Sequence, residues 1–148
     1  MWSSDMAVAQ QVPMPSPVAR LAKSSAIWLR GSNPVRGAAM RLMDHSRFAG
    51  LELEVHSYDE LQIIPFWRYD LVLLEQTRGQ DTGTMTAAIK RVRQLSQAPL
   101  VVLARRVTPE LTMAGLHAGA DSVSLLQSSD RVLLAHWGAM LRRWKPLS

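Results

Sequence analysis

The sequence feature that most constrains the fold is the segment of residues 69–83, YDLVLLEQTRGQDTG. Residues 71–74 are four consecutive apolar residues without polar alternation, which predicts a short strand covered on both faces. Strands of this kind are typical of parallel sheets that lie between two layers of helices. Glu75 follows directly, so it is predicted to stand at the carboxyl end of a central strand. Open α/β sheets place their ligand and reaction sites at that edge.

Four other segments are predicted to be strands. Three of them are apolar runs, and one alternates apolar with acidic residues, as expected of an edge strand with one solvated face. In chain order the four segments are residues 26–29, 51–56, 100–104 and 121–126, and the alternating one is residues 51–56.

Helices are predicted between these strands from apolar residues spaced three and four apart and from capping residues. The first helix begins at Pro34, capped by Ser32 or Asn33, and ends within residues 45–50; a short second helix covers residues 58–64 and ends at Pro65. The last three helices begin at Thr82 or Thr84, at Thr108-Pro109 and at residues 128–130, and the last two end at Gly119 and near Arg143. Five alternations of strand and helix predict a doubly wound, five-stranded parallel sheet.

The length of 148 residues fits one domain. Residues 1–24 contain Pro13, Pro15 and Pro17 and have no apolar periodicity, so they are expected to form a flexible tail before a folded domain of residues 25–146. No apolar run is long enough to span a bilayer, and the first residues lack the pattern of a signal peptide. A cytoplasmic protein without membrane contact is therefore expected.

The chain is basic, with 17 Lys and Arg against 12 Asp and Glu and a net charge of +5. Arginines and lysines are denser at residues 90–93, 105–106 and 142–145. Such clusters can attract nucleic acid or an acidic protein, although a merely solvated surface has the same composition.

Neither a metal site nor a catalytic centre is predicted. The sequence contains no cysteine, which excludes disulfides and thiolate ligands. The four histidines fall on different elements without a metal-binding spacing, and the glycines do not form a nucleotide-binding loop. We therefore expect no cofactor and no enzymatic activity.

Four short motifs together resemble the receiver domains of bacterial response regulators, over residues 25–144. They are Asn33-Pro34 after the first strand, YDLVLLE with Gly83 eight residues beyond Glu75, APLVVL at residues 98–103, and AGAD at residues 118–121. The resemblance implies the strand order 2-1-3-4-5 and a role in two-component signal transduction.

The resemblance also implies that the phosphorylation chemistry of the family is lost. Receivers that accept a phosphoryl group use an acidic pair for Mg²⁺, an Asp nucleophile, a Thr or Ser, and a Lys, because these groups disperse the charge of the transfer. The matching positions, none of which carries the usual residue, are Gly31, Ser32, Glu75, Ala104 and Leu126. The aromatic switch of the family matches Val123. The chain is thus expected to be a degenerate receiver, or pseudo-receiver, without Mg²⁺.

Glu75 has two possible roles in such a protein. It could imitate a permanently phosphorylated aspartate, but the hydroxyl and the ammonium that would recognise this state are missing. Alternatively, Glu75 is a partly buried carboxylate paired with Arg30 or Arg105, both of which follow or end predicted strands. The second role, a structural lock in place of metal and phosphate, is the preferred hypothesis.

The last helix carries more apolar residues than one buried face needs. Val132, Ala135 and Ala139 are expected to pack on the sheet. The remaining large apolar residues either complete the core or form a surface for a partner, and they are Leu133, Trp137, Met140, Leu141 and Trp144. Receivers resemble this arrangement in pairing through their fourth helix, fifth strand and fifth helix.

Three functions follow from these observations. The leading hypothesis is a non-enzymatic signalling module that binds protein partners, including a second copy of itself as a homodimer, through its last helix. The second is a transcription regulator that binds nucleic acid weakly through its Arg clusters. The third is a receiver that still accepts phosphate with unusual residues.

Overall fold

The computed structural model describes residues 24–31, 38–48, 50–76 and 79–144. These residues form one five-stranded parallel sheet in the order β2-β1-β3-β4-β5. The strands are β1 (Ser24–Arg30), β2 (Leu51–Ser57), β3 (Leu71–Glu75), β4 (Leu100–Ala104) and β5 (Ser122–Leu125). The predicted fold class and strand order are therefore confirmed. The expected tail, residues 1–24, lies outside the described residues except for Ser24.

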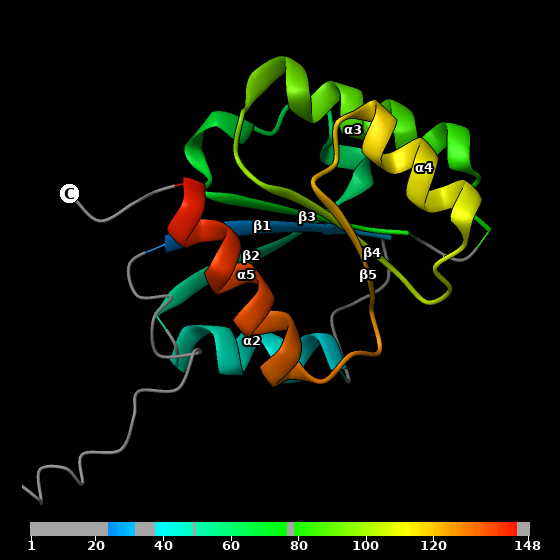
Figure 1. Ribbon diagram of the computed structural model, residues 1–148. Coiled ribbons are helices and arrows are strands. Elements are labelled where there is room, and N and C mark those ends of the chain that lie inside the picture. The colour runs from blue at the N-terminus through cyan, green and yellow to red at the C-terminus, as the bar shows by residue number, and fades with distance from the viewer. Residues whose placement is uncertain (1–23, 32–37, 49, 77–78, 145–148) are drawn as a thin grey trace, which may run out of the picture.

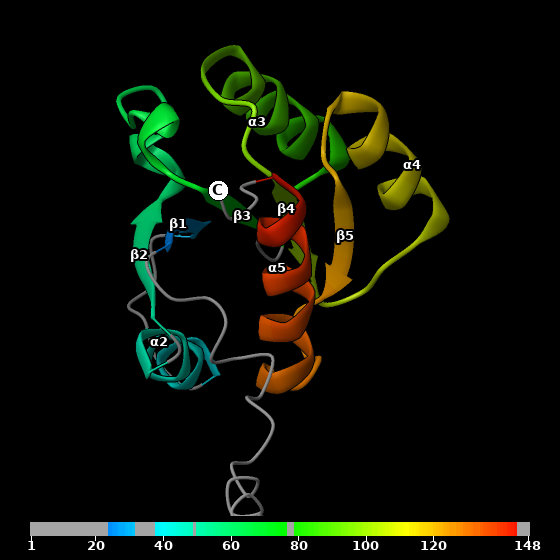
Figure 2. The same cartoon turned by 60° about the vertical axis from the view of Figure 1, so that its left-hand side comes forward.

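Within the described residues, four α-helices cover the sheet (Figure 1). They are α2 (Ala38–Phe48), α3 (Thr82–Leu95), α4 (Pro109–Ala118) and α5 (Asp130–Trp144). Helices α2 and α5 lie on one face, and α3 and α4 lie on the other, as the two views show (Figure 2). In the part of the chain that the structure describes, no helix is both long and apolar enough to cross a membrane. The predicted caps Ser32 and Asn33, and Pro34, lie outside the described residues.

The short helix predicted at residues 58–64 is wrong. Two 3₁₀ turns, η2 (Tyr58–Glu60) and η3 (Phe66–Arg68), link β2 to β3 instead. The backbone bonds span three residues, since the Leu61 N–H donates to the Tyr58 carbonyl oxygen at 3.0 Å. Buried Ile64 and Phe66 hold this link against the core, so tertiary packing decides its shape over local propensity.

Side chains cap the starts of α3 and α4. Helix α3 is capped by Asp81, whose Oδ1 accepts from the Thr84 N–H at 2.6 Å, and not by Thr82 or Thr84 as predicted. Helix α3 begins directly after this carboxylate, so Thr82 is already inside its first turn. Thr108 caps α4 ahead of Pro109, as the sequence predicts.

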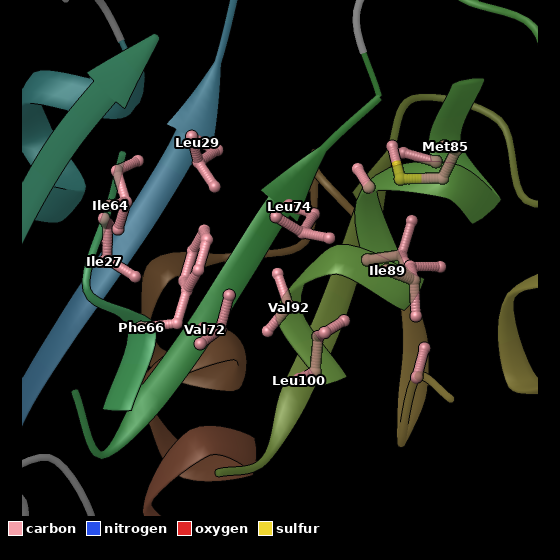
Figure 3. Packing of buried hydrophobic residues seen from close by; sticks show 14 of the residues in the cluster. Ile27, Leu29, Ile64, Phe66, Val72, Leu74, Met85, Ile89, Val92 and Leu100 are labelled. Atoms are coloured by element: carbon pink, nitrogen blue, oxygen red, sulfur yellow. The ribbon is translucent and has the colours of Figure 1, made fainter. Parts of the chain in front are cut away.

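The core consists of two apolar layers separated by the sheet. On β1, Ala26 and Trp28 face α2 and α5, whereas Ile27 and Leu29 face α3 and α4. Figure 3 shows the second layer, in which side chains of β1, β3 and β4 meet Met85, Ile89 and Val92 of α3. Strands buried on both faces explain why their sequences do not alternate.

The apolar residues of α5 are distributed differently from the prediction. Leu133, Trp137, Met140 and Leu141 are all buried in the layer on the α2 and α5 side. Helix α5 packs on the sheet and beside α2 at once, which requires a wide apolar arc. The hypothesis that these four side chains form an exposed partner surface is therefore wrong. Val132, expected to pack on the sheet, is 59% exposed.

Arg93 joins three chain segments at the edge where the strands begin. Its Nε donates to the Gly119 carbonyl oxygen at 2.8 Å, and its Nη1 donates to the Ala98 carbonyl oxygen at 2.6 Å. Its Nη2 pairs with Asp121 Oδ2 at 2.7 Å, and the same oxygen accepts from the Leu100 N–H. One guanidinium thus fixes the entries to β4 and β5.

Arg93→Met is expected to lower the free energy of unfolding by about 2–4 kcal/mol, because several charge-assisted hydrogen bonds to backbone oxygens are lost together. Urea unfolding followed by circular dichroism measures the change. Lys90→Met, at an exposed position of the same helix, should stay within about 0.5 kcal/mol of the wild type. Equal effects of the two substitutions would show that Arg93 does not hold these segments.

Candidate functional site

The candidate site lies at the carboxyl ends of β1 and β3. Leu29 pairs with Leu74 in the sheet, so Arg30 and Glu75 stand side by side on neighbouring strands. Arg30 Nε lies 3.3 Å from Glu75 Oε1, and the side chains are only 15% and 7% exposed. Of the two candidate partners for Glu75, Arg30 makes the ion pair, whereas Arg105 is exposed.

Trp28 completes this cluster. Its indole Nε1 donates to Glu75 Oε1 at 3.0 Å, and the Arg30 guanidinium carbon lies 5.9 Å from the centroid of its ring. The second contact is within the range of a cation–π interaction. Trp28, Arg30 and Glu75, called the Glu75 cluster below, therefore contact one another in all three pairs.

The sequence contained a signal for Trp28 that was missed. Trp28 and Arg30 are two residues apart on β1, so they project to the same face of the sheet. A buried indole N–H usually finds an acceptor, and Glu75 is the only buried carboxylate among the described residues. The predicted strand order therefore already indicates Glu75 as the acceptor for the Trp28 indole.

Arg30 is not saturated with hydrogen bonds. Among the described residues, neither its Nε nor its Nη1 has a hydrogen-bond partner, although both atoms are buried. The 3.3 Å contact with Glu75 is therefore an ion pair in which the N–H is poorly aligned with the carboxylate oxygen. The pair is therefore held mainly by the attraction between the two charges.

Burial raises the pKa of the Glu75 carboxyl above its ordinary value, although Arg30, Trp28 and Arg105 act to lower it. The desolvation of the carboxylate thus outweighs its pairing. A carboxyl group with a raised pKa contributes less stability once the pH rises above that pKa. The pair therefore specifies the geometry of this edge of the sheet and adds little net stability.

Tyr58 connects the site to η2. Its hydroxyl donates to the Glu75 carbonyl oxygen at 2.8 Å, and burial, followed by the Glu75 charge, raises its pKa above the ordinary value. The phenol therefore remains a protonated donor. No local sequence pattern indicates this contact, because it depends on how the link between β2 and β3 folds.

The remaining predicted positions contribute no charged group. Ala104 is fully buried, and its carbonyl oxygen accepts from the Leu126 N–H at 2.8 Å. Leu126 and Val123 are partly buried and pack against the two apolar layers. Gly31 is half-buried, and Ser32 lies outside the described residues.

The described residues of this edge do not fit Mg²⁺. The ion requires several oxygen ligands in an octahedral arrangement. Glu75 supplies the buried carboxylate, but its Oε1 already contacts Arg30 and Trp28. Within the described ranges, no group of three or more His, Cys, Asp or Glu residues could hold a metal ion.

Solved structures that resemble this chain include receiver domains and response regulators. A two-component response regulator from Clostridium difficile has a TM-score of 0.67 at 17% identity and covers 83% of this chain and 99% of its own. The receiver domain of a Francisella response regulator gives the same score and identity and covers 83% and 100%. An orphan response regulator of H. pylori has a TM-score of 0.63 at 20% identity and covers 82% and 99%.

The chain has the receiver fold. No protein-family model matches it, and no curated protein matches it in sequence. The similarity of the receiver structures therefore lies in the path of the backbone, and it carries no residue of the site with it.

Proposed function

We propose that the protein is a phosphorylation-independent signalling module, a pseudo-receiver that acts by binding other proteins. The observation that carries this proposal is the Glu75 cluster. The carboxylate at the position of the phosphoacceptor is buried and already contacts the Arg30 guanidinium and the Trp28 indole. An internal cation and an internal donor occupy the place of the metal and the phosphoryl group.

Phosphoryl transfer to Glu75 is opposed by these contacts. Catalysis of such a transfer depends on positioning and on positive charge around the phosphoryl oxygens. Here Oε1 contacts Arg30 and Trp28, and the positions of the hydroxyl and the ammonium are the apolar Ala104 and Leu126. The aromatic switch is replaced by Val123, so a phosphorylated state would also lack its reporter.

The surface that we propose for partners is made by α4, β5 and the first turn of α5. Figure 2 shows these elements at the same edge of the sheet, which ends at β5. The exposed large apolar residues there are Met113 and Leu116 on α4, Leu125 on β5 and Val132 on α5. Trp144, at the other end of α5, is half-exposed and donates to the Gln97 carbonyl oxygen.

The double variant Met113→Glu/Leu116→Glu is expected to remove self-association while leaving stability within about 1 kcal/mol, because both side chains are exposed. Size-exclusion chromatography with light scattering should show a dimer for the wild type and a monomer for the variant. Ala87→Glu, at an exposed position of α3, introduces the same charge on another face and should remain dimeric. A monomeric wild type at every concentration would exclude the homodimer.

Nucleic-acid binding is the weaker alternative, because the exposed arginines are separated. Arg105 and Arg106 follow β4 at the carboxyl edge of the sheet. Arg142 and Arg143 lie at the end of α5, which returns to the opposite edge, where Trp144 meets Gln97. These clusters do not form one basic surface of the kind that follows a phosphate backbone.

A further inference from the structure

His56 lies at the end of the edge strand β2, between two carboxylates. Its Nδ1 is 3.0 Å from Glu60 Oε1, and its Nε2 is 3.2 Å from Glu54 Oε1. Ionised carboxylates only accept hydrogen bonds, so both ring nitrogens must donate for both contacts to be favourable. This geometry fits the imidazolium, because a neutral ring would turn a lone pair toward one of the carboxylates.

The same carboxylates are also held by other groups. Tyr69 donates its hydroxyl to Glu54 Oε1 at 2.9 Å, and the Arg68 guanidinium on η3 also acts on Glu54. The Ser57 N–H donates to Glu60 Oε2 at 3.3 Å, which closes the capping box of η2. Burial and the hydrogen bond to Glu54 raise the pKa of Tyr69 to about 12, so it remains a donor.

The η2 turn that Glu60 closes also carries Tyr58, whose hydroxyl donates to the Glu75 carbonyl oxygen. A continuous set of contacts therefore runs from His56 through the η2 turn to the end of β3. We propose that protonated His56 is a pH-dependent tie that fixes η2 on the end of β2 and thereby holds Tyr58 at the Glu75 cluster. Loss of the proton releases the tie and loosens that edge of the sheet.

The direction of the pH dependence follows from the pKa shifts of the imidazole and of the two carboxyl groups. Burial acts to lower the pKa of His56, but the hydrogen bonds and charges of Glu60 and Glu54 outweigh it and raise the pKa above 6.5. The tie is therefore fully present below pH 6.5 and is lost as the pH rises through the raised value. His56 lowers the pKa of Glu54 and of Glu60 below 4.5, so their part of the tie is lost only in acid.

An NMR titration of the full chain tests the proposal by following the His56 ring and the Trp28 indole N–H, which reports on Glu75. The His56 midpoint should lie above the ordinary histidine value of 6.5, and the Trp28 signal should shift with the His56 midpoint. Glu54→Gln and Glu60→Gln should each move the His56 midpoint downward without unfolding the protein, because the two side chains are 54% and 42% exposed. His56→Gln should remove the part of the Trp28 response that follows the His56 midpoint, while the part that follows the Glu75 carboxyl remains.

Two results would overturn the proposal. The first is a His56 midpoint at or below the ordinary value of 6.5, which would show that the carboxylates do not hold the proton. The second is a Trp28 signal that ignores the titration of His56, or that keeps the same response in His56→Gln, which would show that the tie does not reach the Glu75 cluster.

Discussion

Arg30→Ala is expected to lower the free energy of unfolding by about 3–5 kcal/mol, because it leaves the Glu75 carboxylate buried without a cation. The Arg30 side chain is 15% exposed and that of Glu75 is 7% exposed, so water cannot replace the guanidinium fully. Chemical unfolding at neutral pH, followed by circular dichroism, measures the loss. The loss should shrink in acid, where the raised pKa of Glu75 allows the carboxyl to become neutral.

Two controls separate the pair from a general effect of charge. Arg105→Ala removes an exposed cation that also acts on Glu75, and it should change stability by no more than about 0.5 kcal/mol. The double variant Arg30→Met/Glu75→Leu should recover most of the loss, because an apolar pair avoids both desolvation costs. An unchanged melting temperature for both Arg30→Ala and Glu75→Gln would contradict the structural lock.

Trp137→Glu is expected to prevent folding. Trp137 is fully buried between α5 and the sheet, so the substitution removes a large apolar side chain and places a carboxylate in the core. Cavity formation alone costs about 3–5 kcal/mol, and the buried charge adds to it, against a total stability of about 5–15 kcal/mol. Far-UV circular dichroism and a thermal scan measure the result.

Position 137 also provides a graded comparison. The Trp137 indole N–H has no hydrogen-bond partner among the described residues, so Trp137→Phe should cost only about 1–2 kcal/mol. Val132→Glu, on the same helix but exposed, should stay within about 0.5 kcal/mol of the wild type. A folded, monomeric Trp137→Glu protein would mean that α5 presents Trp137 to a partner, as the sequence hypothesis allowed.

The fold could be predicted from the sequence because its strands are buried on both faces. Residues 71–74 and 100–104 are uniformly apolar, and each is followed by polar residues, so their ends were correctly located. The caps Thr108 and Gly119 likewise predict the start and the end of α4 from local sequence. Such features depend on a few neighbouring residues, and the sequence contains all of them.

Other features could not be predicted from neighbouring residues, because they depend on contacts between residues far apart in the sequence. The apolar residues of segment 58–64 have the spacing of a helix. The segment nevertheless forms 3₁₀ turns, because Ile64 and Phe66 are buried in the core. The apolar arc of α5 indicated two possible faces, and only the position of α2 decides that both are buried. Tyr58 meets Glu75 through that irregular link, so no periodicity could reveal the contact.

The Glu75 cluster lies between these two cases. Strand order alone predicts that Glu75 lies at a strand end. It also makes Arg30 one of two candidate cations for Glu75. The ion pair with Arg30 and not with Arg105 depends on the strand register, which sets the end of β1 directly beside the end of β3. The Trp28 contact follows from a different rule: a buried indole N–H usually has an acceptor, and here it is Glu75 Oε1.

The most direct test of the central claim is an NMR titration of the Trp28 indole N–H with Mg²⁺ and acetyl phosphate, or with a beryllium fluoride mimic of the phosphoryl group. The signal is assigned by its loss in Trp28→Phe, and the indole reports on Glu75 because it donates to Oε1 at 3.0 Å. We predict that the Trp28 indole signal does not shift at any concentration, because the Glu75 carboxylate already contacts Arg30 and Trp28. A saturable, Mg²⁺-dependent shift, accompanied by a phosphoryl adduct on Glu75 in mass spectrometry, would contradict the account.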